Sequence, residues 1–312
     1  MPARARRSPF PLLALTASAI LLLSGCSTGT EAPSADVADD TAAVREVTHA
    51  RGTTEVPTDV ERVVTLEPLE LDTAVAVGIT PVGAAVASNV STTPAYLDAD
   101  GVEAVGTVPE PDLEAIAALK PDLILGTEAR HSALYEQLSA IAPTVFIETQ
   151  ADPWRDNALL IGEALNKEDE VADLLTSVDE RCASIADEYG VDGQTAQLIR
   201  PRDETTLSLY GPVSFAGSLL ECVGYTIPDQ DWADGLQADI SPENVLDAQA
   251  DEVFVTTADV DDAGTIPAAL TQNAAAFPQV TLVDTSYWVS GVGPKGAHAV
   301  LDDIEKHLEK RR

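Results

Sequence analysis

Short apolar runs alternate with longer amphipathic stretches along most of this 312-residue chain. Such alternation is typical of strands and helices that follow each other in the sequence. The runs that we interpret as strands are residues 63–66, 82–85, 123–126 and 144–147 in the first half and residues 197–200, 207–210, 253–256 and 281–283 in the second half. Because strands separated by helices form helix-covered sheets, the pattern predicts an α/β fold.

Two pairs of stretches match each other and predict two related lobes. Residues 111–125 and residues 241–255 each carry a glutamate followed eight positions later by an aspartate and an apolar run. Each copy begins near a proline, which suits the first turn of a helix. A second match pairs residues 63–78 with residues 207–224, where both copies indicate a strand, a loop and a helix that ends at a Val-Gly pair. Glycine is the residue favoured just after a helix end.

A long amphipathic helix is predicted between the two lobes. Apolar residues recur there at helical spacing, namely Val171, Leu174, Leu175, Val178 and Ile185. A single helix is a stiff connection, so we expect only a small hinge motion between the lobes. The predicted organisation is an N-terminal lobe over residues 59–165, a connecting helix over residues 166–190 and a C-terminal lobe over residues 191–312.

The first 25 residues have the order of a secretory signal peptide, with three arginines before an apolar run at residues 12–23. That run is too short to cross a bilayer, which needs roughly 20 apolar residues. The following Leu-Ser-Gly-Cys26 resembles a bacterial lipobox. The resemblance implies that Cys26 is lipidated and holds the mature chain at the outer face of the cell membrane. An ordinary cleaved signal beside a chance cysteine is the alternative.

The segment after Cys26 is predicted to be a flexible tether over residues 26–58. Its first part, up to residue 45, is small, polar and acidic. A segment of this composition has little apolar surface to bury, so it favours an extended, mobile chain.

Acidic residues greatly outnumber basic ones, with 52 against 18 and a formal net charge of −34. Loss of the first 25 residues removes three arginines and no acid, which leaves a formal charge of −37. A surface of this charge repels nucleic acid and anionic lipid headgroups. We therefore expect no nucleic-acid partner, and contact with the membrane through the lipid anchor only.

Besides Cys26, the chain contains two cysteines, Cys182 and Cys222. In an oxidising exterior they can form one disulfide, and separate buried thiols are the alternative. The four histidines are scattered, and no Cys/His cluster has the spacing of metal ligands. We expect no structural metal and no cofactor.

Several motifs resemble those of the helix-backboned binding proteins for siderophores and cobalamin, most closely their ferric siderophore and ferric citrate branch. In the first half the matching stretches are Arg62-Val-Val-Thr-Leu through Val82-Gly83, Val105-Gly-Thr through Lys120-Pro-Asp-Leu-Ile-Leu-Gly126, and Ala129-Arg-His through Ala142-Pro-Thr144. In the second half they are Leu209-Tyr-Gly through Val223-Gly224, Ile240-Ser-Pro-Glu243 and Val300-Leu-Asp-Asp303. The resemblance implies two Rossmann-like lobes joined by one long connecting helix, with a ligand cleft between the lobes. It also implies a substrate-binding lipoprotein that captures a ferric siderophore or ferric citrate for the permease subunits of an ABC importer.

The same resemblance implies one glutamate in each lobe that docks onto arginines of a permease subunit. By motif these are Glu114 and Glu243, which the repeat places at equivalent helix starts. The alternative is that each glutamate only complements the N-terminus of its own helix, an effect of about 0.3–1 kcal/mol.

Loops that follow strands are where open α/β sheets bind ligands. Three arginines lie at such positions, Arg130, Arg200 and Arg202. Planar guanidinium groups suit the carboxylate or catecholate oxygens of anionic ferric chelates. We predict that these arginines form a locally positive cleft, and surface salt bridges to neighbouring acids are the alternative.

Aromatic residues near the same loops are candidate ligand contacts, namely Tyr210, Tyr287 and Trp288. Core packing is the alternative role for each of them. We expect His131, beside Arg130, to be an exposed loop residue.

Two other readings of the sequence stay open. A cobalamin- or haem-binding protein would share the fold, the anchor and both glutamates. Cobalamin favours an apolar aromatic cleft, and haem needs an axial ligand, whereas the only methionine is Met1. A secreted enzyme is the alternative from another class. The sequence lacks a Gly-x-Ser-x-Gly elbow and a phosphate-binding glycine motif, so we expect no catalytic residues.

Overall fold

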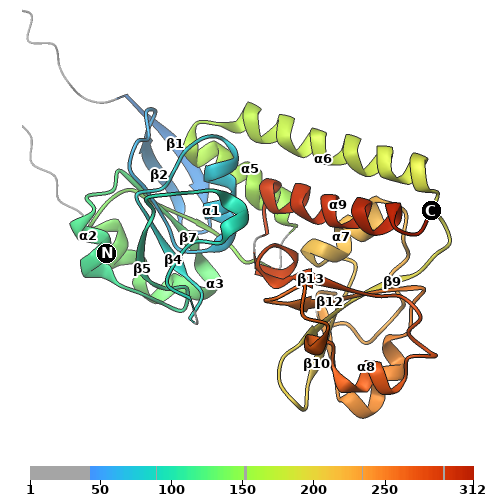
Figure 1. Ribbon diagram of the computed structural model, residues 1–312. Coiled ribbons are helices and arrows are strands. Elements are labelled where there is room, and N and C mark those ends of the chain that lie inside the picture. The colour runs from blue at the N-terminus through green and yellow to red at the C-terminus, as the bar shows by residue number, and fades with distance from the viewer. Residues whose placement is uncertain (1–42, 89, 151–152, 234, 291) are drawn as a thin grey trace, which may run out of the picture. The chain divides into compact units, whose positions relative to one another are not determined.

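The computed structural model describes residues 43–88, 90–150, 153–233, 235–290 and 292–312. Within these residues the chain forms two α/β lobes, each built on its own sheet (Figure 1). None of the described helices combines the length and the apolar composition that a membrane crossing requires.

The first lobe is built on a six-stranded sheet with the order β6-β5-β4-β3-β7-β8. All neighbouring strands are parallel except β5 and β6. The strands are β3 (Val63–Thr65), β4 (Gly83–Val86), β5 (Glu103–Thr107), β6 (Glu110–Pro111), β7 (Leu123–Thr127) and β8 (Thr144–Ile147). The helices are α1 (Pro68–Ala76), η1 (Ala95–Leu97), α2 (Leu113–Ala118), α3 (Glu128–His131), η2 (Ser132–Leu134), α4 (Tyr135–Ser139) and α5 (Trp154–Leu165).

The second lobe is built on a five-stranded sheet with the order β11-β10-β9-β12-β13. Its β9, β12 and β13 are parallel, and β10 and β11 extend the sheet as antiparallel strands. The strands are β9 (Ala196–Pro201), β10 (Leu207–Tyr210), β11 (Gln237–Ile240), β12 (Glu252–Thr257) and β13 (Val280–Asp284). The helices are α7 (Phe215–Cys222), η3 (Pro242–Ala248), η4 (Ala263–Thr265), α8 (Ala268–Gln272), the π-helical turn η5 (Ser286–Ser290) and α9 (Pro294–Glu309).

The repeated aspartate found in the sequence has the same role in both lobes. The carboxylate of Asp122 accepts hydrogen bonds from the backbone N–H groups of Glu61 and Arg62, just before β3. The carboxylate of Asp251 accepts the corresponding bond from the N–H of Thr195, just before β9. Asp122 directly precedes β7, which pairs in parallel with β3. Asp251 directly precedes β12, which pairs in parallel with β9. The repeat therefore fixes the start of β3 and of β9 in the same way.

Both copies of the second match form a strand, a loop and a helix as predicted, but the two strands occupy different places in their sheets. In the first lobe α1 follows β3, which is parallel to both of its neighbours. In the second lobe α7 follows β10, which is antiparallel to both of its neighbours. The strand equivalent to β3 is β9, because β9 pairs in parallel with β12 as β3 does with β7. An extra antiparallel strand thus separates the central strand of the second lobe from its helix.

Residues 44–57, which we predicted as part of a flexible tether over residues 26–58, form an antiparallel hairpin instead. Its strands are β1 (Val44–His49) and β2 (Gly52–Pro57). Val47 and Val56 are completely buried in the core. The tether prediction is wrong over the hairpin because two valines suffice to dock these otherwise polar strands. Residues 26–42 lie outside the described part of the chain.

The connecting helix α6 (Glu168–Tyr189) spans the residues for which the apolar spacing predicted a long helix. It packs against α5 and runs beside α9 (Figure 1). Cys182 of α6 and Cys222 of α7 form a disulfide, with their Cα atoms 5.5 Å apart. Of the two alternatives for these cysteines, the structure shows the disulfide. It fixes the connecting helix to the second lobe.

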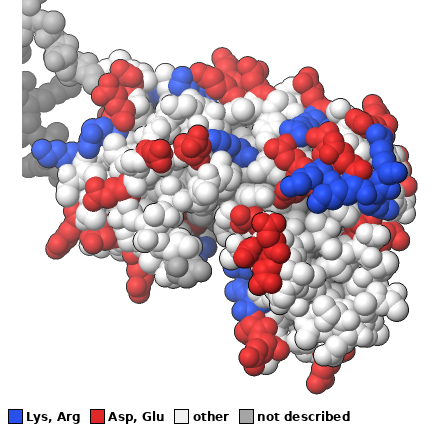
Figure 2. All heavy atoms as spheres, viewed as in Figure 1, with Lys and Arg blue, Asp and Glu red and all other residues white. Residues whose placement is uncertain are grey.

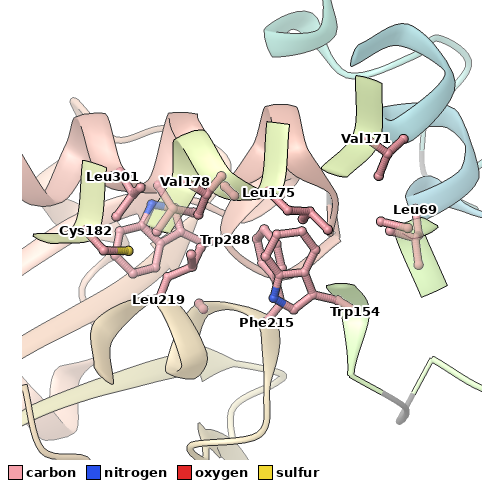
Figure 3. Packing of buried hydrophobic residues seen from close by; sticks show 14 of the residues in the cluster. Leu69, Trp154, Val171, Leu175, Val178, Cys182, Phe215, Leu219, Trp288 and Leu301 are labelled. Atoms are coloured by element: carbon pink, nitrogen blue, oxygen red, sulfur yellow. The ribbon is translucent and has the colours of Figure 1, made fainter. Parts of the chain in front are cut away.

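One apolar core extends from the first lobe through α5 and α6 into the second lobe. Leu69 of α1, Leu175 of α6 and Trp288 of η5 belong to the same buried cluster (Figure 3). The Trp288 ring stacks on Phe254 of β12, with the ring centroids 4.9 Å apart. The lobes are therefore joined by continuous packing in addition to the covalent connection through α6.

A polar contact also joins α1 of the first lobe to the start of α9 in the second. The carboxylate of Asp72 accepts hydrogen bonds from the backbone N–H groups of Lys295 and Gly296, both at 2.8 Å. Burial raises the pKa of Asp72 to about 6. The N-cap residue Gly293 has no side chain of its own to cap the helix, and a Cβ there would collide with the Asp72 carboxylate. The segment that precedes α9 is thus held against the first lobe.

Candidate ligand-binding site

A cavity of about 290 Å³ lies between the two lobes, at the carboxyl ends of β7, β8 and β9. Its polar lining consists of Arg130 and Gln150 from the first lobe and Arg200, Arg202, Tyr210, Ser214 and Gln237 from the second. The predicted cleft between the lobes is therefore present. It brings together all three arginines that were selected from the sequence because they lie at strand ends.

Arg130 is held by a buried carboxylate of its own lobe. Its Nε atom donates to Oε1 of Glu67 at 2.5 Å, and Nε2 of Gln150 donates to the other oxygen of Glu67. The Glu67 side chain is 1% exposed, whereas that of Arg130 is 46% exposed. Burial raises the pKa of Glu67, and the positive charge of Arg130 opposes this rise. Arg130 thus lines the cavity, and the hydrogen bond from its Nε atom to Glu67 fixes the orientation of its guanidinium group.

A second carboxylate, Glu70, lies behind this ion pair on α1 and is completely buried. Its Oε1 atom accepts a long hydrogen bond of 3.5 Å from the Thr127 hydroxyl, and its Oε2 atom has no partner among the described residues. Burial raises the pKa of Glu70 well above its ordinary value, and the nearby charge of Glu67 raises it further. These effects favour the protonated form of Glu70, so that Glu67 is the charged member of the pair.

The two arginines of the second lobe form no ion pair with the acids that the structure describes. Arg200 is the penultimate residue of β9, Arg202 follows the last residue of that strand, and both line the cavity. Nη1 of Arg200 lies 3.4 Å from the Tyr210 hydroxyl. Among the described residues neither guanidinium is within ion-pair distance of a carboxylate. The salt-bridge alternative therefore applies to Arg130 and to neither of these two.

The lack of acidic partners for Arg200 and Arg202 within the described chain contrasts with the large number of acidic residues in the protein. The chain carries 52 acidic residues, and Figure 2 shows acidic side chains spread over the face that it draws. Elsewhere arginines are paired, as Arg155 is with Asp179 and Arg181 is with Glu305. Unpaired arginines inside a cavity of such a protein leave positive charge available to an anion.

The aromatic candidates occupy different places. Tyr210 and Trp288 line the cavity, although Trp288 is 1% exposed and belongs mainly to the core. Trp154 of α5, which the sequence analysis did not select, also lines the cavity and packs edge-on against Phe215. Its position shortly after β8 was the available signal, because the same rule selected Arg130 after β7.

Tyr287, the remaining aromatic candidate, is not among the residues that line the cavity. Its hydroxyl donates to Oδ2 of Asp303 at 2.8 Å, and its ring packs against Tyr96. Trp288 Nε1 donates to the same oxygen at 3.0 Å. Both side chains therefore meet at one oxygen of Asp303, and of the two only Trp288 also lines the cavity.

His131 is buried, contrary to the expectation of an exposed loop residue. Its Nδ1 atom accepts from the N–H of Thr127 at 3.2 Å, and its Nε2 atom lies 2.9 Å from the Val108 carbonyl oxygen. The loop after β7 closes into the short helix α3, which turns the imidazole inward. Both ring nitrogens therefore have structural partners.

Glu114 and Glu243 are both exposed and lie outside the cavity lining. Glu114 is in the first turn of α2, whose N-terminus is already capped by the Asp112 carboxylate. Glu243 is in the first turn of η3. Neither side chain has an ion-pair partner among the described residues, so both carboxylates are accessible to another protein.

Two α/β lobes with a shared core, a long connecting helix and an arginine-lined cavity between them define a two-lobed solute-binding protein. The model of the periplasmic binding protein family matches residues 63–278, and the chain belongs to that family. The fold and the family that the sequence predicted are thereby confirmed.

Known relatives agree with this assignment over nearly their full lengths. The chain is 32% identical to the probable siderophore-binding lipoprotein YfiY of Bacillus subtilis (strain 168), with 94% of this chain and 96% of that protein covered. It is 28% identical to the Fe(3+)-citrate-binding protein YfmC of the same organism, with 93% and 94% covered. The crystal structure of Staphylococcus aureus SirA complexed with staphyloferrin B matches with a TM-score of 0.72 and 30% identity, covering 85% of this chain and 98% of SirA.

Proposed function

We propose that this protein is the substrate-binding component of an ABC importer and captures an anionic ferric chelate, a siderophore or ferric citrate, between its lobes. The observation that carries this proposal is the pair Arg200 and Arg202, which form no ion pair with any described residue and line the same cavity as Arg130. Charged groups inside a cleft attract ions of opposite sign and pair strongly with their oxygens. The binding of siderophores and ferric citrate by similar proteins supports the same ligand class.

Capture would work through contacts that both lobes make with one ligand. A chelate that touches Arg130 on the first lobe and Arg200 on the second stabilises the conformation in which the lobes are closest. The shared core and the Asp72 contact favour a small closing motion. In this role iron is cargo, the protein needs no resident cofactor, and no bond is made or broken.

A fluorescence titration tests the proposal, because Trp154 and Trp288 line the cavity and report on its occupation. Purified protein is titrated with ferric citrate, several ferric siderophores, the iron-free chelators, cobalamin and haem. We expect a saturable response at one equivalent for an anionic ferric chelate, without consumption of the chelate. A response to cobalamin or haem alone, or turnover of any added compound, would show that the proposal is wrong.

We further propose that the protein is anchored to the outer face of the cell membrane by lipid on Cys26, which lies outside the described residues. Cys26→Ala removes the sulfur that would carry the lipid, and it should release the protein from membranes or stop its processing. The measurement is the distribution of the protein between membrane and soluble fractions. Ser27→Ala, at the neighbouring position, is the matched control and should stay membrane-bound. Normal cleavage together with full membrane retention of Cys26→Ala would contradict the anchor.

A further inference from the structure

A buried negative charge lies beside one of the arginines that are to attract an anion. The Glu67 carboxylate contacts Arg130 and Gln150, and both of these line the cavity, whereas Glu67 does not. By charge alone Glu67 opposes the binding of an anionic chelate, since it reduces the positive potential around Arg130. Its place in the site therefore needs another explanation.

The three residues meet because they follow three adjacent parallel strands. Glu67 follows β3, Arg130 follows β7 and Gln150 follows β8, and these strands are neighbours in the order β3-β7-β8. Glu67 is the N-cap residue of α1, and this position directs its backbone into a helix packed in the core. The carboxylate thus belongs to a rigid part of the lobe.

Both oxygens of Glu67 are occupied, one by Arg130 and the other by Gln150. Its side chain is almost completely buried, so a chelate in the cavity can reach Arg130 but not Glu67. Arg130 uses its Nε atom in this contact, and its terminal Nη groups have no partner within the described chain. Glu67 can therefore influence a chelate only through the groups that it holds.

The consequence is a difference between the lobes. An arginine side chain has many rotamers, and fixing them in the free protein removes an entropic cost from binding. Arg130 is fixed in this way, whereas no carboxylate of the described residues holds Arg200 or Arg202, and Arg200 has only a long contact of 3.4 Å with the Tyr210 hydroxyl. The first lobe presents a guanidinium of set orientation, and the second lobe presents two that can adjust to the chelate.

We propose that Glu67, supported by Gln150, is a positioning residue that orients Arg130 to recognise the planar oxygen pairs of an anionic ferric chelate. This inference rests on the proposed function of the cavity. Under it, the first lobe determines which ligand geometry fits, and the second lobe adds adjustable positive charge.

A double-mutant cycle between Glu67 and Arg130 tests the inference. The probe is ferric citrate, or a ferric tris-catecholate if ferric citrate does not bind. Glu67→Met removes both acceptors at similar side-chain length, and it should weaken binding about tenfold, the loss typical of one charge-assisted contact. In the Arg130→Ala background the same substitution should change the affinity by less than about twofold, because Glu67 acts through Arg130.

Two further variants separate positioning from charge and from folding. Glu67→Gln keeps one acceptor for Arg130 and should bind within about threefold of the wild type, even if Glu67→Met fails to fold. Glu70→Gln replaces an equally buried neighbour that does not contact Arg130, and it should bind like the wild type. The thermal midpoint of each variant shows whether it is folded.

The outcomes distinguish this inference from the function on which it rests. Stronger binding by Glu67→Met, or binding by Glu67→Gln that is more than about threefold stronger than that of the wild type, would mean that Glu67 acts only by its charge, and would overturn the inference. An equal loss in both Arg130 backgrounds would overturn it as well. If neither chelate binds the wild-type protein, the proposed function itself fails. If the wild type binds and Arg130→Ala weakens binding while Glu67→Met does not, only the positioning role fails.

Discussion

Replacing both Arg200 and Arg202 by alanine is expected to weaken the binding of an anionic ferric chelate by about a hundredfold to ten-thousandfold. Each charge-assisted contact contributes about 1.5–3 kcal/mol, and each 1.4 kcal/mol corresponds to about a tenfold change in affinity. The two guanidinium groups form no ion pair within the described chain, so their loss should change the free energy of unfolding by less than about 1 kcal/mol. Affinity is measured by titration and folding by thermal denaturation.

The matched control is the pair Arg45→Ala and Arg155→Ala, which removes two arginines that do not line the cavity. This control should bind as the wild type does. Added salt should weaken binding by the wild type more than by the Arg200, Arg202 variant, because screening acts over about 8 Å at physiological ionic strength. Wild-type affinity in the Arg200, Arg202 variant would show that these two residues do not bind the chelate.

Reversing the charge of both Glu114 and Glu243 should abolish uptake by cells while chelate affinity stays within a few-fold of the wild type. Both carboxylates are exposed and lie outside the cavity lining, one in the first turn of a helix in each lobe. If they dock onto arginines of the permease, lysine at both positions replaces attraction by repulsion. Uptake is measured with radioactive iron in cells that contain the variant, and affinity is measured with the purified protein.

The control for this reversal is Glu55→Lys with Asp173→Lys, which makes the same change in net charge at exposed positions on β2 and α6. It should leave uptake near the wild-type level. Normal uptake by the Glu114, Glu243 variant would refute the docking role. A loss of affinity above about tenfold would instead assign these glutamates to ligand binding.

The parts of the fold that the sequence predicts are those with a strong local signal. The connecting helix α6 was predictable because Val171, Leu175 and Val178 form one apolar stripe that becomes its buried face. The hairpin at residues 44–57 was not predicted because its buried valines are isolated among polar residues. The edge strand β11 was not predicted for a related reason, since none of its residues is fully buried.

The candidate site likewise has some features that the local sequence predicts and others that depend on the tertiary structure. Lying at the end of a strand or just after it is a property of the local sequence, and it suffices to select Arg130, Arg200 and Arg202, which the structure brings into one cavity. The contact between Glu67 and Arg130 joins residues 63 positions apart, so it depends on the pairing of β3 with β7. That Trp288 lines the cavity and Tyr287 does not depends on how the turn η5 packs against the rest of the lobe, which the local sequence does not give.

The most direct test of ligand capture between the lobes is a crystal structure of the protein with the ferric chelate that binds it most tightly. We predict that the chelate occupies the cavity between the lobes, with its oxygens within hydrogen-bond distance of Arg130 and of at least one of Arg200 and Arg202. A chelate bound outside this cavity, or bound inside it without contact to any of the three arginines, would contradict the proposal.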